Sequence, residues 1–98
     1  EKAVQHIEIA NALEPNKPRV LAALGYAWFQ LGEAVNARGF LEQSVQLSPK
    51  FALAWYHLGN TQVALGDKNS AIESFKVAIQ LQPTFKQAKE ALYKVQGR

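Results

Sequence analysis

Apolar residues recur along this chain every three to four positions, in segments separated by short polar stretches. Between residues 68 and 81 they include Ala71, Ile72, Phe75, Ala78, Ile79 and Leu81, a spacing typical of the buried face of an amphipathic helix. No segment of useful length alternates apolar with polar residues, so no strand is predicted. The pattern predicts helices near 1–13, 18–31, 34–47, 52–65, 68–81 and 85–96.

Residues that stop or start helices stand between these segments. Gly66 can adopt the left-handed conformation that ends a helix, and Asp67 can cap the next one. Pro83 ends the fifth segment, because proline lacks the N–H and disfavours helix in the residue before it. Thr84-Phe85-Lys86-Gln87 has the form of a capping box for the last helix. The short linkers force neighbouring helices to run antiparallel, as a stack of helical hairpins.

Proline recurs at a constant interval of 34 residues, at Pro15, Pro49 and Pro83. Residues 18–51 laid over 52–85 give nine identical pairs, against about two expected from ordinary composition. Such a period indicates a repeat architecture. We therefore expect one domain over 1–98, made of the second half of a repeat in 1–17, whole repeats in 18–51 and 52–85, and a C-terminal capping helix in 86–98.

The second whole repeat resembles the signature of the tetratricopeptide repeat family. The matching residues are Trp55, Tyr56, His57, Leu58, Gly59, Gly66, Ala71, Phe75, Ala78 and Pro83. Residues 18–51 depart from the signature at Leu21, where the family has Trp, at Leu41, where it has Phe, and at Ser44, where it has a small apolar residue. The resemblance covers the whole chain and implies an all-α fold, a right-handed superhelical stack of antiparallel helix hairpins.

Small residues recur in both whole repeats, at Gly25, Ala37, Gly59, Ala71 and Ala78. We expect paired helices to cross closely at these positions, where a larger side chain would overpack the contact. Larger apolar residues are expected to fill the space between hairpins, namely Leu24, Leu41, Leu58 and Phe75.

The first helix of each whole repeat carries two apolar stripes, although a surface helix needs only one for packing. The packing stripe of 18–31 holds Leu21, Leu24, Gly25 and Trp28, and that of 52–65 holds Trp55, Leu58 and Gly59, with Gln62 as a polar interruption. The second stripe exceeds what hairpin packing demands, so it is a candidate for binding. It holds Ala22, Tyr26 and Phe29 in the first repeat and Leu53, Tyr56, Asn60 and Val63 in the second.

The resemblance implies that first helices line a concave face and bind peptides there. Carried over position by position, the predicted partner-binding residues are Arg19, Ala22, Tyr26, Phe29, Gln30, Leu53, Tyr56, Asn60, Val63, Gln87, Glu90 and Lys94. Tyrosine offers a large contact area at small entropy cost, and the amide of Asn60 can both donate to and accept from a peptide backbone. The alternative is that Tyr26 and Phe29 simply pack on a neighbouring helix.

One subtype of the family grips the C-terminal carboxylate of a chaperone tail with Lys, Asn and Arg side chains. The matching positions here hold Ala22, Tyr26, His57, Gln87 and Ala91. None of these residues fits that role, so we predict that the chain does not bind such tails through a carboxylate clamp.

Composition narrows the classes of protein to which this chain can belong. The chain has 98 residues, 48% of them hydrophobic, and no cysteine, which indicates one globular domain with neither disulfides nor thiolate metal sites. Its longest apolar runs are too short to insert into a membrane. The chain lacks methionine and starts within the repeat pattern, so we expect a piece of a longer protein. The compartment is not determined, with a soluble, cytoplasmic location slightly favoured.

The net charge of +3 comes from the C-terminal segment, where Lys86, Lys89, Lys94 and Arg98 oppose only Glu90. A solvated end helix accounts for this excess, whereas tracking of phosphates would need a larger basic stripe. We therefore expect no nucleic-acid partner, although the pI near 9.4 and the aromatic residues keep an RNA-binding helical repeat as the alternative.

Residues for catalysis are missing from the sequence. Asp67 is the one aspartate and is explained as a helix cap, and His6 and His57 are the two histidines. No glycine-rich phosphate loop and no cluster with metal-ligand spacing is present. The chain is therefore expected not to be an enzyme and to need no cofactor.

The N-terminal half repeat would leave Val4, Ile7 and Ala10 uncovered, because stacked repeats bury their faces only against neighbours. Either preceding helices cover this surface, or the chain self-associates through it. The last helix has a polar face typical of a solubilising cap. Together these features predict a non-catalytic scaffold that binds a protein or peptide in a concave groove. A non-catalytic arm of a larger enzyme or of a secretion or assembly machine is a further alternative.

Overall fold

The computed structural model describes residues 17–97, which contain helices α2 (Pro18–Gln30), α3 (Ala34–Leu47), α4 (Ala52–Ala64), α5 (Lys68–Leu81) and α6 (Lys86–Gln96). No strand occurs within these residues. Each helix begins and ends within one residue of the bounds expected from the apolar spacing, so the all-α prediction is confirmed. The helix predicted near 1–13 lies outside the described residues.

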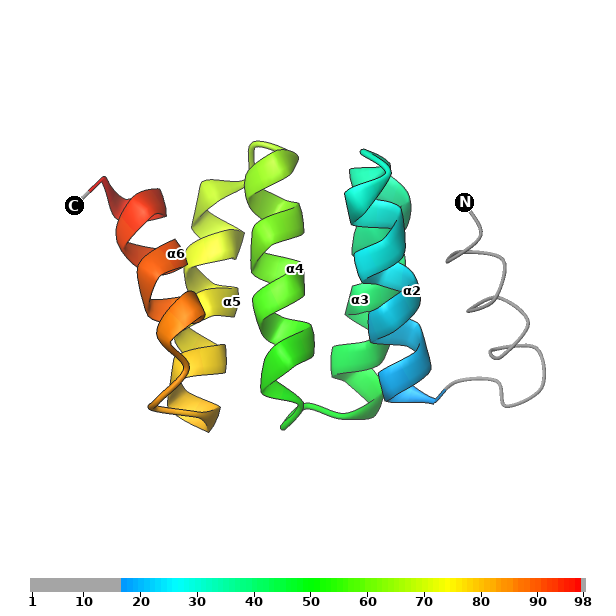
Figure 1. Ribbon diagram of the computed structural model, residues 1–98, viewed down its shortest axis with the longest axis horizontal. Coiled ribbons are helices and arrows are strands. Elements are labelled where there is room, and N and C mark those ends of the chain that lie inside the picture. The colour runs from blue at the N-terminus through cyan, green and yellow to red at the C-terminus, as the bar shows by residue number, and fades with distance from the viewer. Residues whose placement is uncertain (1–16, 98) are drawn as a thin grey trace.

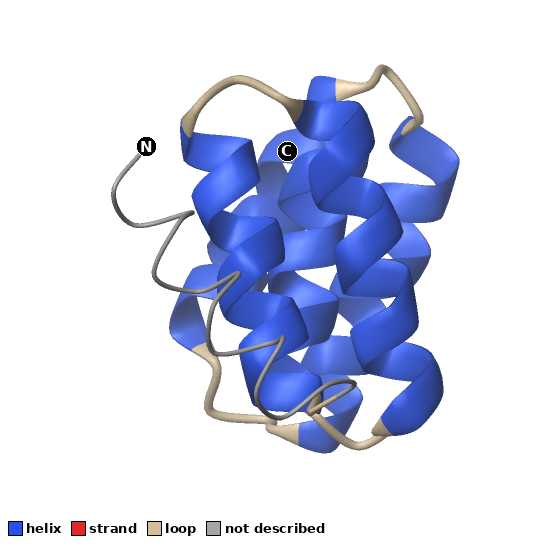
Figure 2. Ribbon diagram, turned by 90° about the vertical axis from the view of Figure 1, so that its right-hand side faces the viewer, coloured by secondary structure: helices blue, strands red, loops and turns tan. Residues whose placement is uncertain are grey.

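The helices are arranged in two rows. Helices α2, α4 and α6 form one row, and α3 and α5 lie behind them (Figure 1). Within the described part, α2 contacts α4 and α4 contacts α6, whereas α3 and α5 do not contact each other. The α2–α4–α6 row is therefore the inner, concave side of the stack. The end-on view shows the long axes of the helices in both rows aligned with one another, while successive helices alternate in chain direction (Figure 2).

The two hairpins turn in the same way. Gly32 and Gly66 both have a φ of 81°, the left-handed conformation that glycine adopts without a steric cost. The backbone N–H of Glu33 donates to the Trp28 carbonyl at 2.9 Å, and that of Asp67 donates to the Gln62 carbonyl at 2.9 Å. These matching bonds give α2–α3 and α4–α5 the same turn.

The predicted caps differ in their outcome. The Asp67 carboxylate accepts a hydrogen bond from the Ser70 backbone N–H at 3.3 Å, so that cap is confirmed. The capping box predicted at residues 84–87 is wrong, because α6 begins after Phe85, which forms no side-chain cap. The Phe85 ring is buried in a cluster with Ala52, Ala78 and Ala88. Packing of this ring, rather than a backbone N–H bond to the Thr84 side chain, positions the start of α6.

Glycine permits the close crossing inside each hairpin. A Cβ atom on Gly25 would lie 2.6 Å from Leu41 Cγ, and one on Gly59 would lie 2.5 Å from Phe75 Cε1. Both distances are shorter than van der Waals contact. Leu41 and Phe75 are themselves fully buried. The prediction of close crossings at these two glycines is confirmed.

Leu41 also takes part in the contact between hairpins. It belongs to a buried cluster that includes Ala54 and Leu58 of α4. The polar interruption at Gln62 has a structural explanation, because Ser74 Oγ donates to Gln62 Oε1 at 2.7 Å and both side chains are buried. A buried amide that is satisfied in this way costs little stability.

Candidate functional site

A hollow of about 570 Å³ lies between α2 and α4, on the concave side of the stack. Its lining residues are Arg19, Ala22, Ala23, Tyr26, Phe51, Leu53 and His57. The four residues from α2 share one face of that helix, because they are spaced by three and four positions. The α4 side is formed by Phe51, which directly precedes α4, and by Leu53 and His57 in the first half of that helix. The hollow therefore lies where two neighbouring hairpins meet.

The rings of Tyr26 and His57 stack across the junction of α2 and α4. Their centroids are 4.4 Å apart and their planes are inclined by 28°. Gln30 Nε2 donates to the Tyr26 hydroxyl at 3.0 Å. This oxygen accepts that bond, so the hydroxyl retains its own hydrogen to donate. Because Tyr26 lines the hollow and is 40% exposed, a ligand in the hollow can contact this side chain.

His57 is half-buried beside the tyrosine. Burial lowers the pKa of His57 to about 4, because a charged imidazolium would lose hydration there. At neutral pH the ring is therefore uncharged and offers one N–H donor and one acceptor. The hollow thus combines a largely apolar wall with a small number of polar groups, as in many ligand-binding clefts.

The predicted face divides into residues inside and outside the hollow. Arg19, Ala22, Tyr26 and Leu53 line it. Ala22 is buried at its base, with 3% of its surface exposed, whereas Leu53 is 45% exposed. Outside the lining, the exposed residues of the predicted set are Gln30, Val63, Gln87, Glu90 and Lys94, and the half-buried ones are Phe29, Tyr56 and Asn60.

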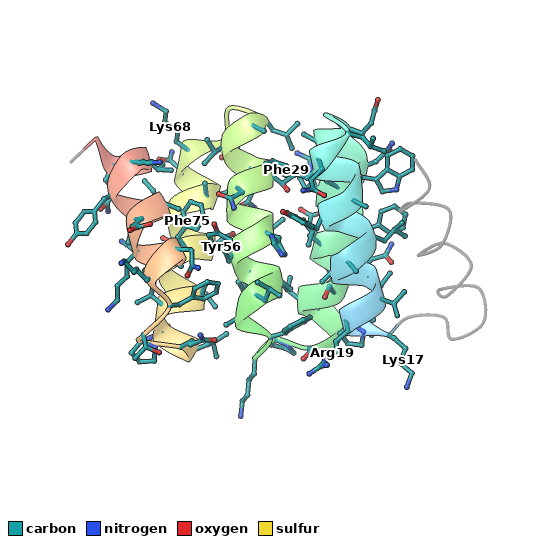
Figure 3. The ribbon with its side chains drawn as sticks, viewed as in Figure 1. Lys17, Arg19, Phe29, Tyr56, Lys68 and Phe75 are labelled. Atoms are coloured by element: carbon teal, nitrogen blue, oxygen red, sulfur yellow. The ribbon has the colours of Figure 1, made fainter. Side chains whose placement is uncertain are left out.

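The half-buried aromatic residues pack on neighbouring groups. Phe29 lies against the buried cluster that includes Ala22 and Leu41. The ring centroid of Tyr56 is 5.0 Å from that of Phe85 and 6.1 Å from that of Phe75, toward α5 and α6 (Figure 3). These rings contribute to packing between helices, so Tyr26 is the aromatic residue of the predicted set that lines the hollow.

Three lining residues were not among those predicted, namely Ala23, Phe51 and His57. His57 and Leu53 are four positions apart and therefore share a face of α4, which is the signal that could have identified the histidine. Phe51 precedes α4 and belongs to no helical stripe. Its position follows from the path of the linker, which the apolar spacing does not describe.

Two kinds of site are not found in the described part of the chain. Among residues 17–97, no group of three or more His, Cys, Asp or Glu side chains comes together as a metal site would require. Within the same residues, no helix combines the length and the apolar character needed to cross a membrane.

Residues 52–85 match the family model described as tetratricopeptide repeat. Among curated proteins, the chain is 32% identical over 102 residues to the human protein O-mannosyl-transferase TMTC1. That alignment covers 97% of this chain and 11% of the human protein. The chain therefore spans about a tenth of the length of this relative.

Solved structures share the fold over almost the whole chain. The Sgt2 TPR domain from Aspergillus fumigatus superposes with a TM-score of 0.94 at 22% identity, covering 98% of this chain and 65% of that one. The first TPR of Spaghetti (RPAP3), bound to an HSP90 peptide, superposes with a TM-score of 0.92 at 19% identity, covering 96% of this chain and 75% of that one.

Proposed function

Because this chain is a tetratricopeptide repeat protein, we propose that the hollow between α2 and α4 binds a segment of a partner protein. The observation that carries the proposal is the lining of the hollow. Its exposed tyrosine and leucine are not needed to close either hairpin, since 40% of Tyr26 and 45% of Leu53 remain exposed. Exposed apolar surface in a concave site is typical of a binding surface.

The lining suits a peptide in two respects. A bulky apolar side chain of the partner can enter the hollow against Phe51 and Leu53, which removes apolar surface of both molecules from water. The Tyr26 hydroxyl and the neutral His57 ring can exchange hydrogen bonds with the peptide backbone. Large aromatic residues in such positions commonly supply much of the binding energy.

The proposed ligand differs from a chaperone tail held by its terminal carboxylate. A structural neighbour is bound to an HSP90 peptide, but the identity of 19% carries only the fold to this chain. The clamp positions hold Ala22, Tyr26, His57, Gln87 and Ala91, which provide no cationic side chain. We therefore propose that this chain recognises an internal segment rather than a free C-terminus.

We also propose that the chain acts without catalysis, as one interaction module of a larger protein. The human relative is named as an O-mannosyl-transferase, and the matched region is 11% of its length. A module of this size in a longer chain is suited to holding a partner while chemistry is performed elsewhere. The same observation favours the arm of a larger enzyme as the second candidate.

The test selects peptides from a random displayed library on the wild-type protein and measures their affinity for variants. Replacing Tyr26 by Ala and Leu53 by Ser in one protein should weaken the selected peptides by at least about tenfold, which corresponds to about 1.4 kcal/mol. Both side chains are substantially exposed, so the variant should fold. Tyr56 is left intact because its ring packs on Phe75 and Phe85.

The matched control is Val35→Ser, which changes an apolar residue of α3 that is 64% exposed and lies in the outer row. The control should keep the affinity of the selected peptides. Circular dichroism should show the same helix content in all three proteins. Peptides that bind the double variant as tightly as the wild type would exclude the hollow as their site.

A further inference from the structure

Basic residues lie at or beside the starts of the three inner helices. Helices α2, α4 and α6 all begin at the lower edge of the molecule in Figure 1. No acidic residue occurs in the first turn of any of these helices. The residues at or beside these starts are Lys17, Arg19, Lys50 and Lys86, and all four are exposed. We call them the basic edge.

Acidic residues of the described part lie elsewhere. Glu33 and Asp67 are the N-caps of α3 and α5, in the turns at the upper edge of the molecule in Figure 1. Glu42 and Glu73 belong to α3 and α5, which form the outer row, and Glu90 is on α6. Figure 3 shows Lys17 and Arg19 at the lower edge of the molecule and Lys68 at the upper edge. Among residues 17–97, no acidic residue therefore lies in the first turn of an inner helix, and the acidic residue nearest in sequence to the basic edge is Glu90, four positions after Lys86 on α6.

The basic edge adjoins the hollow. Arg19 belongs to both, since it lines the hollow together with Phe51 and Leu53. Lys50 directly precedes Phe51 in the chain. A ligand that places an apolar side chain in the hollow therefore brings its neighbouring residues within reach of cationic groups. Carboxylates match these groups, and a guanidinium can bind a carboxylate through two hydrogen bonds.

We propose that the partner segment is an acidic peptide, with a bulky apolar residue in the hollow and glutamate or aspartate side chains against Arg19 and Lys50. The inference rests on the proposed function, because it identifies the chemistry of a ligand for the same hollow. It needs no free C-terminal carboxylate. Because the cationic groups are exposed, the acidic preference is expected to weaken as salt rises.

The experiment uses three fluorescent peptides of equal length with amidated C-termini. Each has Leu-Phe at its centre, flanked by glutamates in the first, glutamines in the second and lysines in the third. Anisotropy titrations at low salt should show at least about tenfold tighter binding of the glutamate peptide than of the glutamine peptide. The lysine peptide should bind more weakly than both, and high salt should reduce the differences.

Variants locate the preference on the molecule. Arg19→Gln with Lys50→Gln should bring the affinities of the glutamate and glutamine peptides close together, because it removes the cationic groups that distinguish the two peptides. Lys68→Gln is the control for a remote charge, because it removes a positive charge at the opposite edge of the molecule (Figure 3). It should leave the acidic preference unchanged. A preference that survives the Arg19→Gln/Lys50→Gln change would overturn the inference.

The remaining outcomes separate the two proposals. Equal binding of the glutamate and glutamine peptides, lost on Tyr26→Ala with Leu53→Ser, would overturn the acidic preference and keep the proposed function. If neither these peptides nor any library peptide depends on Tyr26 and Leu53, both proposals fall. Tighter binding of single-stranded RNA or of vesicles with anionic lipid, with the same dependence on Arg19 and Lys50, would assign the basic edge to that ligand and overturn the inference.

Discussion

Tyr26 and His57 belong to different hairpins, and their contact is the link between packing and recognition in this protein. The stacked rings lie 4.4 Å apart, so they join α2 to α4 and also form a wall of the hollow. Burial makes the uncharged form of His57 the stable one and lowers its pKa to about 4. The stability of the hairpin junction should therefore depend on pH.

The direction of this dependence follows from proton binding. The unfolded chain, with an ordinary histidine pKa of about 6.5, binds a proton at a higher pH than the folded chain does. Stability from the neutral ring is thus fully present above about pH 6.5 and is lost as the pH falls toward about 4. We expect a loss of about 2 kcal/mol, less than the full shift would give, because His57 is only half-buried.

Urea denaturation at a series of pH values checks this expectation. In the variant His57→Phe, which keeps an aromatic ring beside Tyr26, the loss of unfolding free energy between pH 6.5 and 4 should be smaller than in the wild type. The variant retains His6, so the difference between the two curves isolates His57. Parallel curves would show that His57 titrates alike in the folded and unfolded chains.

At the scale of the helices, the closeness of each hairpin depends on one glycine. The fully buried ring of Phe75 from α5 packs directly against Gly59 of α4. Its Cε1 atom lies 2.5 Å from the position that a Cβ on residue 59 would occupy. Gly25 has the same relation to Leu41. A helix gains stability when glycine becomes alanine, but here the added methyl group would displace a packed side chain.

We therefore expect Gly59→Ala to lower the free energy of unfolding by roughly 1–3 kcal/mol, because overpacking outweighs the gain in helix propensity. The control is Gly39→Ala in α3, where no atom from another part of the fold lies within 4 Å of the new Cβ. That variant should be more stable than the wild type by up to about 1 kcal/mol. Thermal or chemical denaturation measures the stability of both variants. If Gly59→Ala stabilised the protein as much as Gly39→Ala, the close crossing at Gly59 would be contradicted.

At the scale of the whole molecule, each helix packs chiefly on its neighbours in the stack. The described part extends 42 Å along its longest axis, and α6 contacts α5 and α4 but neither α2 nor α3. In such linear arrays, stability is approximately a sum of units and their nearest-neighbour contacts. Disruption of one end should therefore leave the far end folded.

Ala88→Asp tests this independence. Ala88 is fully buried in a cluster with Ala52, Ala78 and Phe85, and an unpaired carboxylate there is costly. We expect α6 to detach and lose protection of its amide protons, while α2 and α3 keep most of theirs. Hydrogen exchange resolved by residue measures the difference. A uniform loss of protection across residues 18–96 would show that the molecule unfolds as one unit.

Much of the fold follows from the sequence alone, for a physical reason. Helix spacing, glycine at the turns and proline after the hairpins are local features, so each acts through residues only a few positions away. Recurrence after 34 residues shows that the same hairpin is formed again, and repeated hairpins must stack to bury their apolar faces. The crossings at Gly25 and Gly59 were predictable because both repeats place a small residue there.

The hollow and its charge were decided by the tertiary structure. An aromatic residue of an inner helix can line a binding hollow or pack on the next helix. Which of the two occurs depends on how neighbouring hairpins are placed, and a local sequence pattern does not contain that information. Tyr26 and Tyr56 looked alike in the sequence, yet one lines the hollow and the other packs on Phe75 and Phe85. The basic edge likewise arises because antiparallel hairpins bring the starts of α2, α4 and α6 to one end.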